Sequence, residues 1–300
     1  MMKQDSSIHF ETCPACGSGR IHEVLSARDH TVSGEVFEIW QCDECTLRFT
    51  QDIPGPGDIG PYYQSADYIS HTNSNRGLIN RLYHIVRKLT LGDKRRLIQS
   101  ASGLKNGKLL DIGAGTGFFV QHMQRAGWQT TGLEPDETTR QRAASLHKTN
   151  LLDTEAFYHM PAESFDVITM WHVLEHVHDL HPYLDQLKKV LTPGGKIFIA
   201  VPNYTSYDAR VYKGFWAAYD VPRHLYHFSP ESIRRLFGKH ALQVQSIRSM
   251  RYDSFYISFL SEKYRQGSSV KGFFVALLSN MKAFINKEHC SSVIYIISNP

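Results

Sequence analysis

The feature that most limits the folds open to this chain is a short apolar run that leads directly into three closely spaced glycines. The run is Lys108-Leu-Leu-Asp-Ile112, and Gly113-Ala-Gly-Thr-Gly117 follows it at once. The next residues, Phe118 to Ala126, have helical character and are closed by Gly127. This order predicts a buried parallel strand, a tight turn and a helix. Glycines in such a turn let the backbone approach a ligand at the carboxyl end of the strand.

Two common glycine-rich motifs fit this turn poorly. The dinucleotide fingerprint needs its third glycine where Phe118 stands, and the phosphate-binding loop needs a Gly-Lys-Ser/Thr sequence that is missing here. A second expected strand, Trp128-Gln-Thr-Thr-Gly-Leu-Glu134, ends in an acid about twenty residues after the turn. A carboxylate at that place can accept hydrogen bonds from both hydroxyls of a ribose.

The rest of the chain continues the alternation of strands and helices. Further strands are expected at Asp166–Met170, Lys196–Val201 and Ser292–Ser298, with an apolar helix face at Leu180, Leu184, Leu187 and Leu191. Ser229-Pro-Glu231 is typical of a helix start, with serine as cap and proline in the first turn. The pattern predicts an α/β fold with a doubly wound, mostly parallel sheet.

In these motifs the chain resembles class I S-adenosylmethionine-dependent methyltransferases. The resemblance rests on Leu109–Gly117, Glu134 and Phe165-Asp-Val-Ile-Thr-Met170, and it covers roughly residues 106–245. It implies a seven-stranded Rossmann-like sheet in a domain of residues 106–300, with the last strand antiparallel between two neighbours. It also implies that S-adenosylmethionine is the cofactor. The residues expected to contact it are Asp111, Gly113, Gly115 and Gly117 at the amino acid part, Glu134 at the ribose and Asp153 at the adenine.

Four of the five cysteines form two C-x-x-C pairs near the N-terminus. They are Cys13 and Cys16, then Cys42 and Cys45, and Gly17 supplies the left-handed residue that such a turn needs. In a cytosolic chain, paired spacing of this kind favours metal thiolates over disulfides, with a redox pair or four unrelated thiols as the alternative. The sequence therefore predicts a zinc ribbon over residues 1–55 with a structural Zn²⁺, which stabilises the fold without an open coordination position. Cys290 is left over as a plain thiol.

Charge is distributed unevenly around the boundary Ile53-Pro-Gly-Pro-Gly57. Residues 1–55 carry four basic and nine acidic side chains, a net charge of −5, whereas residues 76–108 carry nine basic side chains and one acid, a net charge of +8. Residues 56–105 are expected to form a helical connector. Its apolar face is marked by Leu78, Leu82, Ile85 and Leu89, and Gly92-Asp93 is expected to end this helix. Its basic face is interpreted as solvated surface, with binding of phosphate, nucleic acid or acidic lipid as the alternative.

Substrate contacts are expected after the fourth and fifth strands. His172 directly follows the fourth strand, and its ordinary pKa near 6.5 suits a base. The aromatic segment of residues 204–228 is long for a loop between a strand and a helix, which favours a substrate lid. Arg223 and His224 within it are further catalytic candidates, although an aromatic clamp with a structural Arg and His fits equally well. Residues 255–290 are expected to be a helical insertion over the sheet.

The sequence His172-Val-Leu-Glu175-His176 also matches H-x-x-E-H, the inverted zinc peptidase signature. A peptidase would need this motif inside a long helix, together with a later ligand, whereas here the motif adjoins the end of an expected strand. In the methyltransferase family, a similar Leu-Glu-His segment follows the fourth strand and opens the next helix.

Together these features predict a zinc-ribbon methyltransferase that acts on a small molecule, a saccharide or another metabolite carrier. An RNA methyltransferase that uses the basic connector is the alternative, and the acidic ribbon argues against it because phosphates need basic partners. A zinc-dependent hydrolase and a non-catalytic binding module are more remote alternatives. No signal peptide or membrane span is expected, so the predicted location is the cytoplasm.

Overall fold

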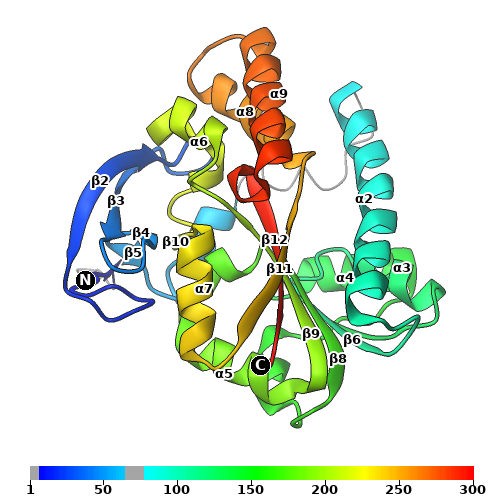
Figure 1. Ribbon diagram of the computed structural model, residues 1–300. Helices are drawn as coiled ribbons and strands as arrows, with labels where there is room; N and C mark the ends of the chain where they lie inside the picture. Colours follow the sequence, from blue (N-terminus) through cyan, green and yellow to red (C-terminus); the bar gives the residue numbers. More distant parts are fainter. Residues whose placement is uncertain (1–6, 65–77) are drawn as a thin grey trace, which may run out of the picture.

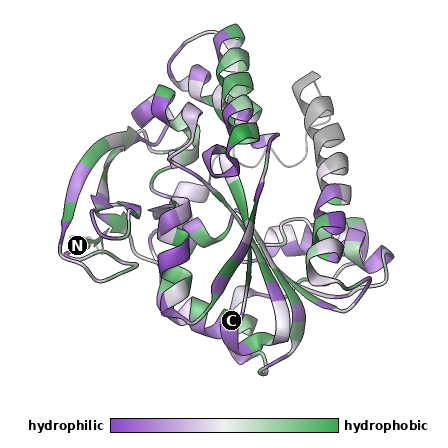
Figure 2. Cartoon of the chain, viewed as in Figure 1, coloured by the Kyte–Doolittle hydropathy of each residue, from purple (hydrophilic) through white to green (hydrophobic). Residues whose placement is uncertain are grey.

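The computed structural model describes residues 7–64 and 78–300, and for residues 78–89 it describes the backbone alone. Figure 1 shows a central sheet with helices on both faces and, at its left, a smaller sheet formed by the N-terminal residues. Hydrophobic residues are frequent along the central strands (Figure 2). None of the helices that the structure describes is both long enough and apolar enough to span a bilayer.

The main sheet has the strand order β11-β12-β9-β8-β6-β7. Its members are β6 (Lys108–Ile112), β7 (Gln129–Leu133), β8 (Phe165–Trp171), β9 (Leu191–Pro202), β11 (Gln243–Ser249) and β12 (Ser292–Ser298). Strands β7, β6, β8 and β9 are parallel, and β12 runs antiparallel to both β9 and β11. This confirms the mostly parallel α/β sheet and the antiparallel position of the last strand.

The sheet has six strands in the described part of the chain, so the expected number of seven is wrong. The missing strand is reduced to one parallel bridge between Leu133 and Leu152. The next residue, Asp153, already caps the short helix η2 (Thr154–His159) by accepting a hydrogen bond from the Glu155 N–H at 3.0 Å. A strand cannot extend there because the chain turns into a helix after one paired residue.

The helices follow the sequence pattern except at Leu191, which was expected on a helix face and is instead the first residue of β9. After the glycine turn, α3 (Phe118–Arg125) packs beside the sheet, followed by α4 (Glu137–His147) and α5 (Leu180–Val190). Helix α7 (Pro230–Lys239) begins at Ser229, which caps it reciprocally with Ser232. The expected serine cap is therefore confirmed.

The connector contains one long helix, α2 (Leu78–Ser102), which continues through Gly92 and Asp93. The expected break at these two residues is wrong. Glycine inside a helix costs about 1 kcal/mol relative to alanine, and the packing of Ile98 in a cluster with Leu109 and Trp128 offsets that cost. The apolar residues expected on the first half of this helix (Leu78, Leu82, Ile85 and Leu89) lie outside the described side chains.

The N-terminal residues form antiparallel strands. These are β1 (Ser7–Ile8), β2 (Ile21–Arg28), β3 (Val36–Cys42), β4 (Arg48–Thr50) and β5 (Ile53–Pro54). Strand β4 also pairs with β10 (Tyr226–His227), which belongs to the segment expected to be a lid. The cysteines and Phe49 lie in the same buried cluster as Leu110 of the main sheet. The ribbon and the main sheet therefore share one continuous core.

Residues 204–228 form a buried layer between the ribbon and a helical pair. They contain α6 (Tyr207–Tyr212), η4 (Lys213–Phe215), η5 (Ala217–Tyr219) and β10. Helices α8 (Asp253–Tyr264) and α9 (Ser269–Ile285), then η6 (Lys287–His289), lie between β11 and β12 in the chain and project above the sheet in Figure 1. Asp208 joins the two parts, because its carboxylate accepts hydrogen bonds from Trp216 Nε1 at 2.8 Å and Ser279 Oγ at 2.7 Å.

Candidate active site and zinc site

The glycine turn lies at the carboxyl end of β6 and has the conformation that its sequence requires. Gly113, Gly115 and Gly117 have φ angles of 71°, 53° and 76°, a region that other residues rarely adopt. A side chain added at Gly113 would overlap Val173, whereas the space around Gly115 is open. The turn therefore leaves its middle residue accessible to a ligand.

Glu134 closes this site from the end of β7. Its Oε2 accepts a hydrogen bond from the Gly115 N–H at 2.9 Å, and its Oε1 accepts one from the Asp136 N–H at 3.2 Å. The carboxylate is largely buried, and burial raises its pKa above the ordinary value. Asp153 lies near the same edge, where it pairs with Arg140 at 2.8 Å. The structure thus brings the turn and Glu134 into direct contact. Asp153 lies beside them, because Leu133 and Leu152, the residues before Glu134 and Asp153, pair in a parallel bridge.

Asp111 is buried below the turn. It accepts a hydrogen bond from Thr169 Oγ1 at 2.6 Å, and burial raises its pKa to about 7. Lys94 of α2 lies near enough to lower that pKa, and its Nζ is 4.0 Å from the centroid of the Trp171 ring. Burial lowers the pKa of Lys94 itself to about 8. Within the connector, expected to present a solvated basic face, Lys94 instead faces the site.

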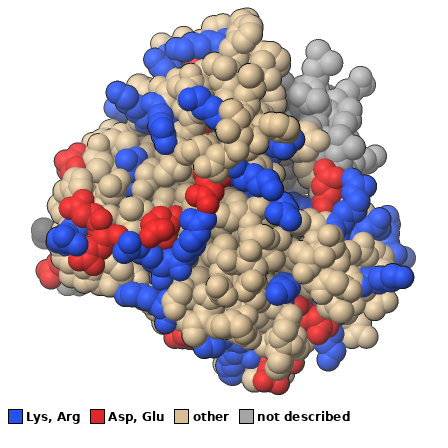
Figure 3. Space-filling view, in the orientation of Figure 1, with Lys and Arg blue, Asp and Glu red and all other residues tan. Residues whose placement is uncertain are grey.

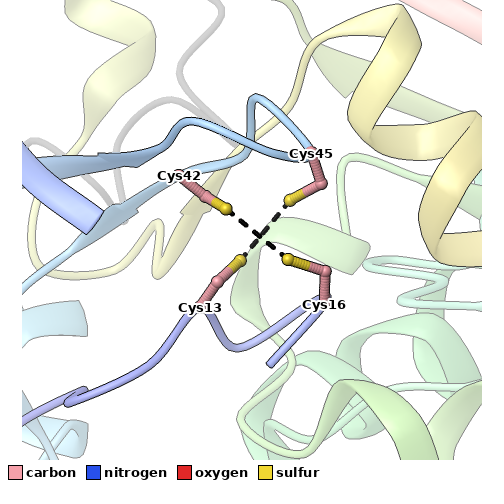
Figure 4. A group of neighbouring side chains, drawn as sticks. All are labelled: Cys13, Cys16, Cys42 and Cys45. Carbon is pink, nitrogen blue, oxygen red and sulfur yellow. Dashed lines mark hydrogen bonds between the residues drawn. The ribbon is translucent and has the colours of Figure 1, made fainter. Parts of the chain in front are cut away.

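The four paired cysteines converge on one point (Figure 4). Their sulfur atoms all lie within 4.8 Å of one another, with Cys13 and Cys45 3.4 Å apart and Cys16 and Cys42 3.5 Å apart. All four are free thiols, since these separations far exceed a disulfide bond. Zinc–sulfur bonds of about 2.3 Å place sulfur atoms nearly 4 Å apart in a tetrahedron. The four side chains therefore fit the predicted structural Zn²⁺.

Two matching turns hold the cysteines. The residue after the second cysteine of each pair is left-handed, with φ angles of 78° at Gly17 and 62° at Thr46. Each turn is closed by a backbone hydrogen bond to the first cysteine, from Gly17 N to Cys13 O at 2.8 Å and from Thr46 N to Cys42 O at 3.0 Å. The role predicted for Gly17 is confirmed, and Thr46 takes the same role in the second turn.

His172 lies at the end of β8, held between two carboxylates. Its Nε2 is 3.0 Å from Asp253 Oδ2, and its Nδ1 is 3.4 Å from Glu175 Oε1. Burial alone would lower its pKa, but the two acids outweigh burial and raise the pKa to about 10. A histidine that is protonated at neutral pH holds no lone pair for a proton. This geometry favours a positioning role over the predicted role as a base.

Residues 174–176 form the short helix η3 (Leu174–His176), and His172 is left-handed with a φ of 59°. The H-x-x-E-H motif therefore does not lie on one long helix, as the peptidase alternative requires. Glu175 and His176 instead meet His224 of the segment 204–228, with one ligand atom of each within 4.8 Å of the others. Val173 packs against Gly113, so this group adjoins the glycine turn.

Arg223 is buried, with 1% of its surface exposed, and acts as a clamp between distant segments. Its Nη2 donates to Asp29 Oδ1 of the ribbon at 3.0 Å and to Asp220 Oδ1 at 2.6 Å. Its Nη1 donates to the backbone oxygen of Tyr62 at 2.8 Å. Because the guanidinium is buried and engaged by these partners, the structure favours the structural alternative for Arg223 over a substrate contact.

Sequence reasoning missed the partners that come from other segments. Asp253, Asp29 and Lys94 are single charged residues in unremarkable surroundings, and only packing brings them to the site. Glu175 and His176 had a local signal, the H-x-x-E-H match, but their third neighbour His224 lies 48 residues after His176 in the chain.

Comparisons with known proteins agree with this geometry. The family model described as methyltransferase domain matches residues 85–247. The chain is 38% identical over 111 residues to ubiquinone biosynthesis O-methyltransferase of Psychrobacter cryohalolentis, which covers 34% of this chain and 43% of that protein. It is 29% identical over 187 residues to the protein of the same name in Vibrio cholerae, covering 58% of this chain and 74% of that protein.

One solved structure with a similar fold is a putative sarcosine dimethylglycine methyltransferase from Galdieria sulphuraria. Its TM-score is 0.50 at 13% identity, covering 70% of this chain and 85% of that chain. This likeness concerns the fold alone. The chain spans less than half of the length of the Psychrobacter relative. Because the family model matches more than half of its residues, the chain belongs to the methyltransferase domain family.

Proposed function

We propose that the protein transfers a methyl group from S-adenosylmethionine to a hydroxyl group of a small-molecule acceptor. The observation that carries this proposal is the contact between the open glycine turn and Glu134, at the carboxyl ends of two neighbouring parallel strands. Ligands of doubly wound sheets bind at this edge. Asp111 and the turn would hold the amino acid part of the cofactor, Glu134 the ribose, and Asp153 would lie on the adenine side.

The acceptor would bind on the other side of the turn, beside His176 and His224. Methyl transfer from a sulfonium requires an in-line approach, so positioning of the acceptor is the main task of the protein. His172 would position Glu175 there, and Arg223 would fix the segment that carries His224. The names of the relatives, which are O-methyltransferases of ubiquinone biosynthesis, support a hydroxyl on a small molecule as the acceptor.

Charge also supports a small molecule over RNA. Figure 3 shows acidic side chains gathered over the ribbon, at the left. In the described part of the connector, Lys94 faces the site, and Arg96 pairs with Asp93. Nucleic acid binding draws on several unpaired basic side chains that neutralise phosphates.

Incubation with methyl-labelled S-adenosylmethionine and a fractionated cell extract tests the proposal. We expect label to appear in a small-molecule fraction, to be unaffected by nuclease, and to fall strongly with Glu134→Ala. Label that is incorporated into material that nuclease destroys would favour the RNA alternative. A protein that does not bind the cofactor would contradict methyl transfer altogether.

A further inference from the structure

Glu175 is a buried acid whose carboxylate lacks hydrogen-bond donors among the described residues. It has no exposed surface, and neither carboxylate oxygen accepts a hydrogen bond within the part of the chain that the structure describes. The nearest charge is His172 Nδ1, 3.4 Å from Oε1. Even with His172 beside one oxygen, the other acceptor positions of this buried carboxylate are unfilled, and a bound cation would offset that cost. One ring nitrogen each of His176 and His224 lies within 4.8 Å of it.

In each of the two histidines, Nδ1 contacts a backbone oxygen, which makes Nε2 the candidate ligand atom. His176 Nδ1 is 2.9 Å from the backbone oxygen of Arg223, and His224 Nδ1 is 2.8 Å from the backbone oxygen of Ala218. A carbonyl oxygen only accepts hydrogen bonds, so each Nδ1 carries the hydrogen and each Nε2 keeps its lone pair. Metal-binding histidines nearly always donate their second nitrogen to such an outer partner.

We propose that Glu175, His176 and His224 bind one divalent transition-metal ion, separate from the cysteine-bound zinc. Two imidazoles and one carboxylate suit zinc, iron or cobalt, and three protein ligands leave a coordination position open. Ligand bonds of about 2.0–2.2 Å require the three atoms to move together by roughly 1 Å. His176 is partly exposed, which gives an ion a path to the site.

This ligand set differs from the H-x-x-E-H set. His172 is outside it, because its Nε2 is 3.0 Å from Asp253 and its left-handed backbone removes it from the helix. The third ligand comes instead from the segment 204–228. Asp220 Oδ2 lies 4.0 Å from His224 Nε2, but it already pairs with Arg223. The metal would therefore tie this segment to the end of β8.

The site would hold an oxygen of the acceptor at its open position. Val173, between His172 and Glu175 in the chain, packs against Gly113 of the cofactor turn, so the ion would adjoin the methyl donor. This role rests on the proposed methyl transfer, whereas binding of the metal does not. The two can fail separately, since metal content and cofactor affinity are measured independently.

The test uses the full chain and Co²⁺ as probe. Protein treated with a mild chelator, which leaves the thiolate-bound zinc in place, is titrated with Co²⁺ and followed by visible spectroscopy and metal analysis. We expect about one additional ion per chain, with the spectrum of a nitrogen and oxygen site that lacks thiolate charge transfer. We also expect a rise in melting temperature, because an ion that binds only the folded state stabilises it.

His224→Ala and His176→Ala should each weaken Co²⁺ binding at least 10- to 100-fold, the loss that removal of even an outer partner causes. His227→Gln is the matched control, since His227 lies in the same segment but outside the cluster, and it should bind Co²⁺ normally. Retained zinc shows that each variant is folded. No additional Co²⁺ in the parent protein, binding that survives both histidine variants, or binding that depends on His172 but not on His224 would overturn the proposal.

Discussion

The cofactor turn and the junction around Arg223 are built in opposite ways. The turn uses residues 111–134, which are nearly continuous in the chain, and its shape follows from three left-handed glycines. The junction consists of two sets of pairs, in which Arg223 of the segment 204–228 binds Asp29 of the ribbon, and His172 after β8 lies between Glu175 and Asp253 of α8. The comparison indicates that the turn tolerates changes elsewhere, whereas the junction depends on every segment that reaches it.

Removing the predicted zinc should separate the two regions most strongly. In a Cys13→Ser, Cys42→Ser double variant, we expect zinc to fall from about one ion per chain to almost none, because two of the four ligands are lost. Ribbon strand β4 pairs with β10, so hydrogen exchange should accelerate in residues 204–228 and much less in residues 108–134. Cys290→Ser is the control with normal zinc. Full zinc retention, or equal acceleration in both regions, would contradict this account.

Arg223→Met tests the junction directly. Loss of one partner leaves the carboxylates of Asp29 and Asp220 buried without their cation, and breaking a buried pair costs about 3–5 kcal/mol of unfolding free energy. Arg234→Met, which breaks an exposed pair with Glu288, should cost about 0–1 kcal/mol. Denaturant unfolding measures both. Equal costs for the two variants would show that Arg223 is not a clamp.

The same contrast explains what could be predicted from the sequence. The alternation of strands and helices, the glycine turn, the position of Glu134 and the cysteine site follow from local spacing, because each depends on neighbours a few residues apart. His172 and Arg223 were expected to contact the acceptor, yet Asp253 and Asp29 hold them. Nothing in the sequence near His172 or Arg223 indicates these partners, because packing of segments 81 and 194 residues away supplies them. The prediction of a seventh strand was wrong for a local reason, because Asp153 caps a short helix where that strand would continue.

Glu134→Ala should weaken S-adenosylmethionine binding by about 1.5–3 kcal/mol, since hydrogen bonds to a charged group are lost. That corresponds to roughly 10- to 150-fold in dissociation constant. The control is Glu137→Ala, an exposed acid in the first turn of α4 whose variant should bind normally. Calorimetry measures both dissociation constants. An unchanged affinity for S-adenosylmethionine in Glu134→Ala would show that Glu134 does not bind the cofactor.

Cofactor affinity should also depend on pH through Asp111. Burial raises the pKa of this acid to about 7 in the free protein, against the opposing influence of Thr169 and Lys94 and with a further rise caused by Glu134. The ammonium group of S-adenosylmethionine favours the carboxylate, so affinity should fall as pH drops below 7, by at most about tenfold per unit. Asp111→Asn should abolish this slope. A parent protein with equal affinity at pH 6 and pH 8 would contradict the role of Asp111.

The most direct test of the separation between the cofactor turn and the acceptor side is the cofactor affinity of His224→Ala. His224 clusters with Glu175, which follows β8, whereas Glu134 follows β7 on the other side of β6. Calorimetry should therefore give a dissociation constant for S-adenosylmethionine within about twofold of the parent value, below the 1.4 kcal/mol that marks a tenfold change. Methyl transfer by the same variant should fall by about 10²- to 10⁴-fold, as expected for a group at the reacting oxygen. A loss of cofactor affinity as large as that of Glu134→Ala, or methyl transfer at the parent rate, would contradict the account.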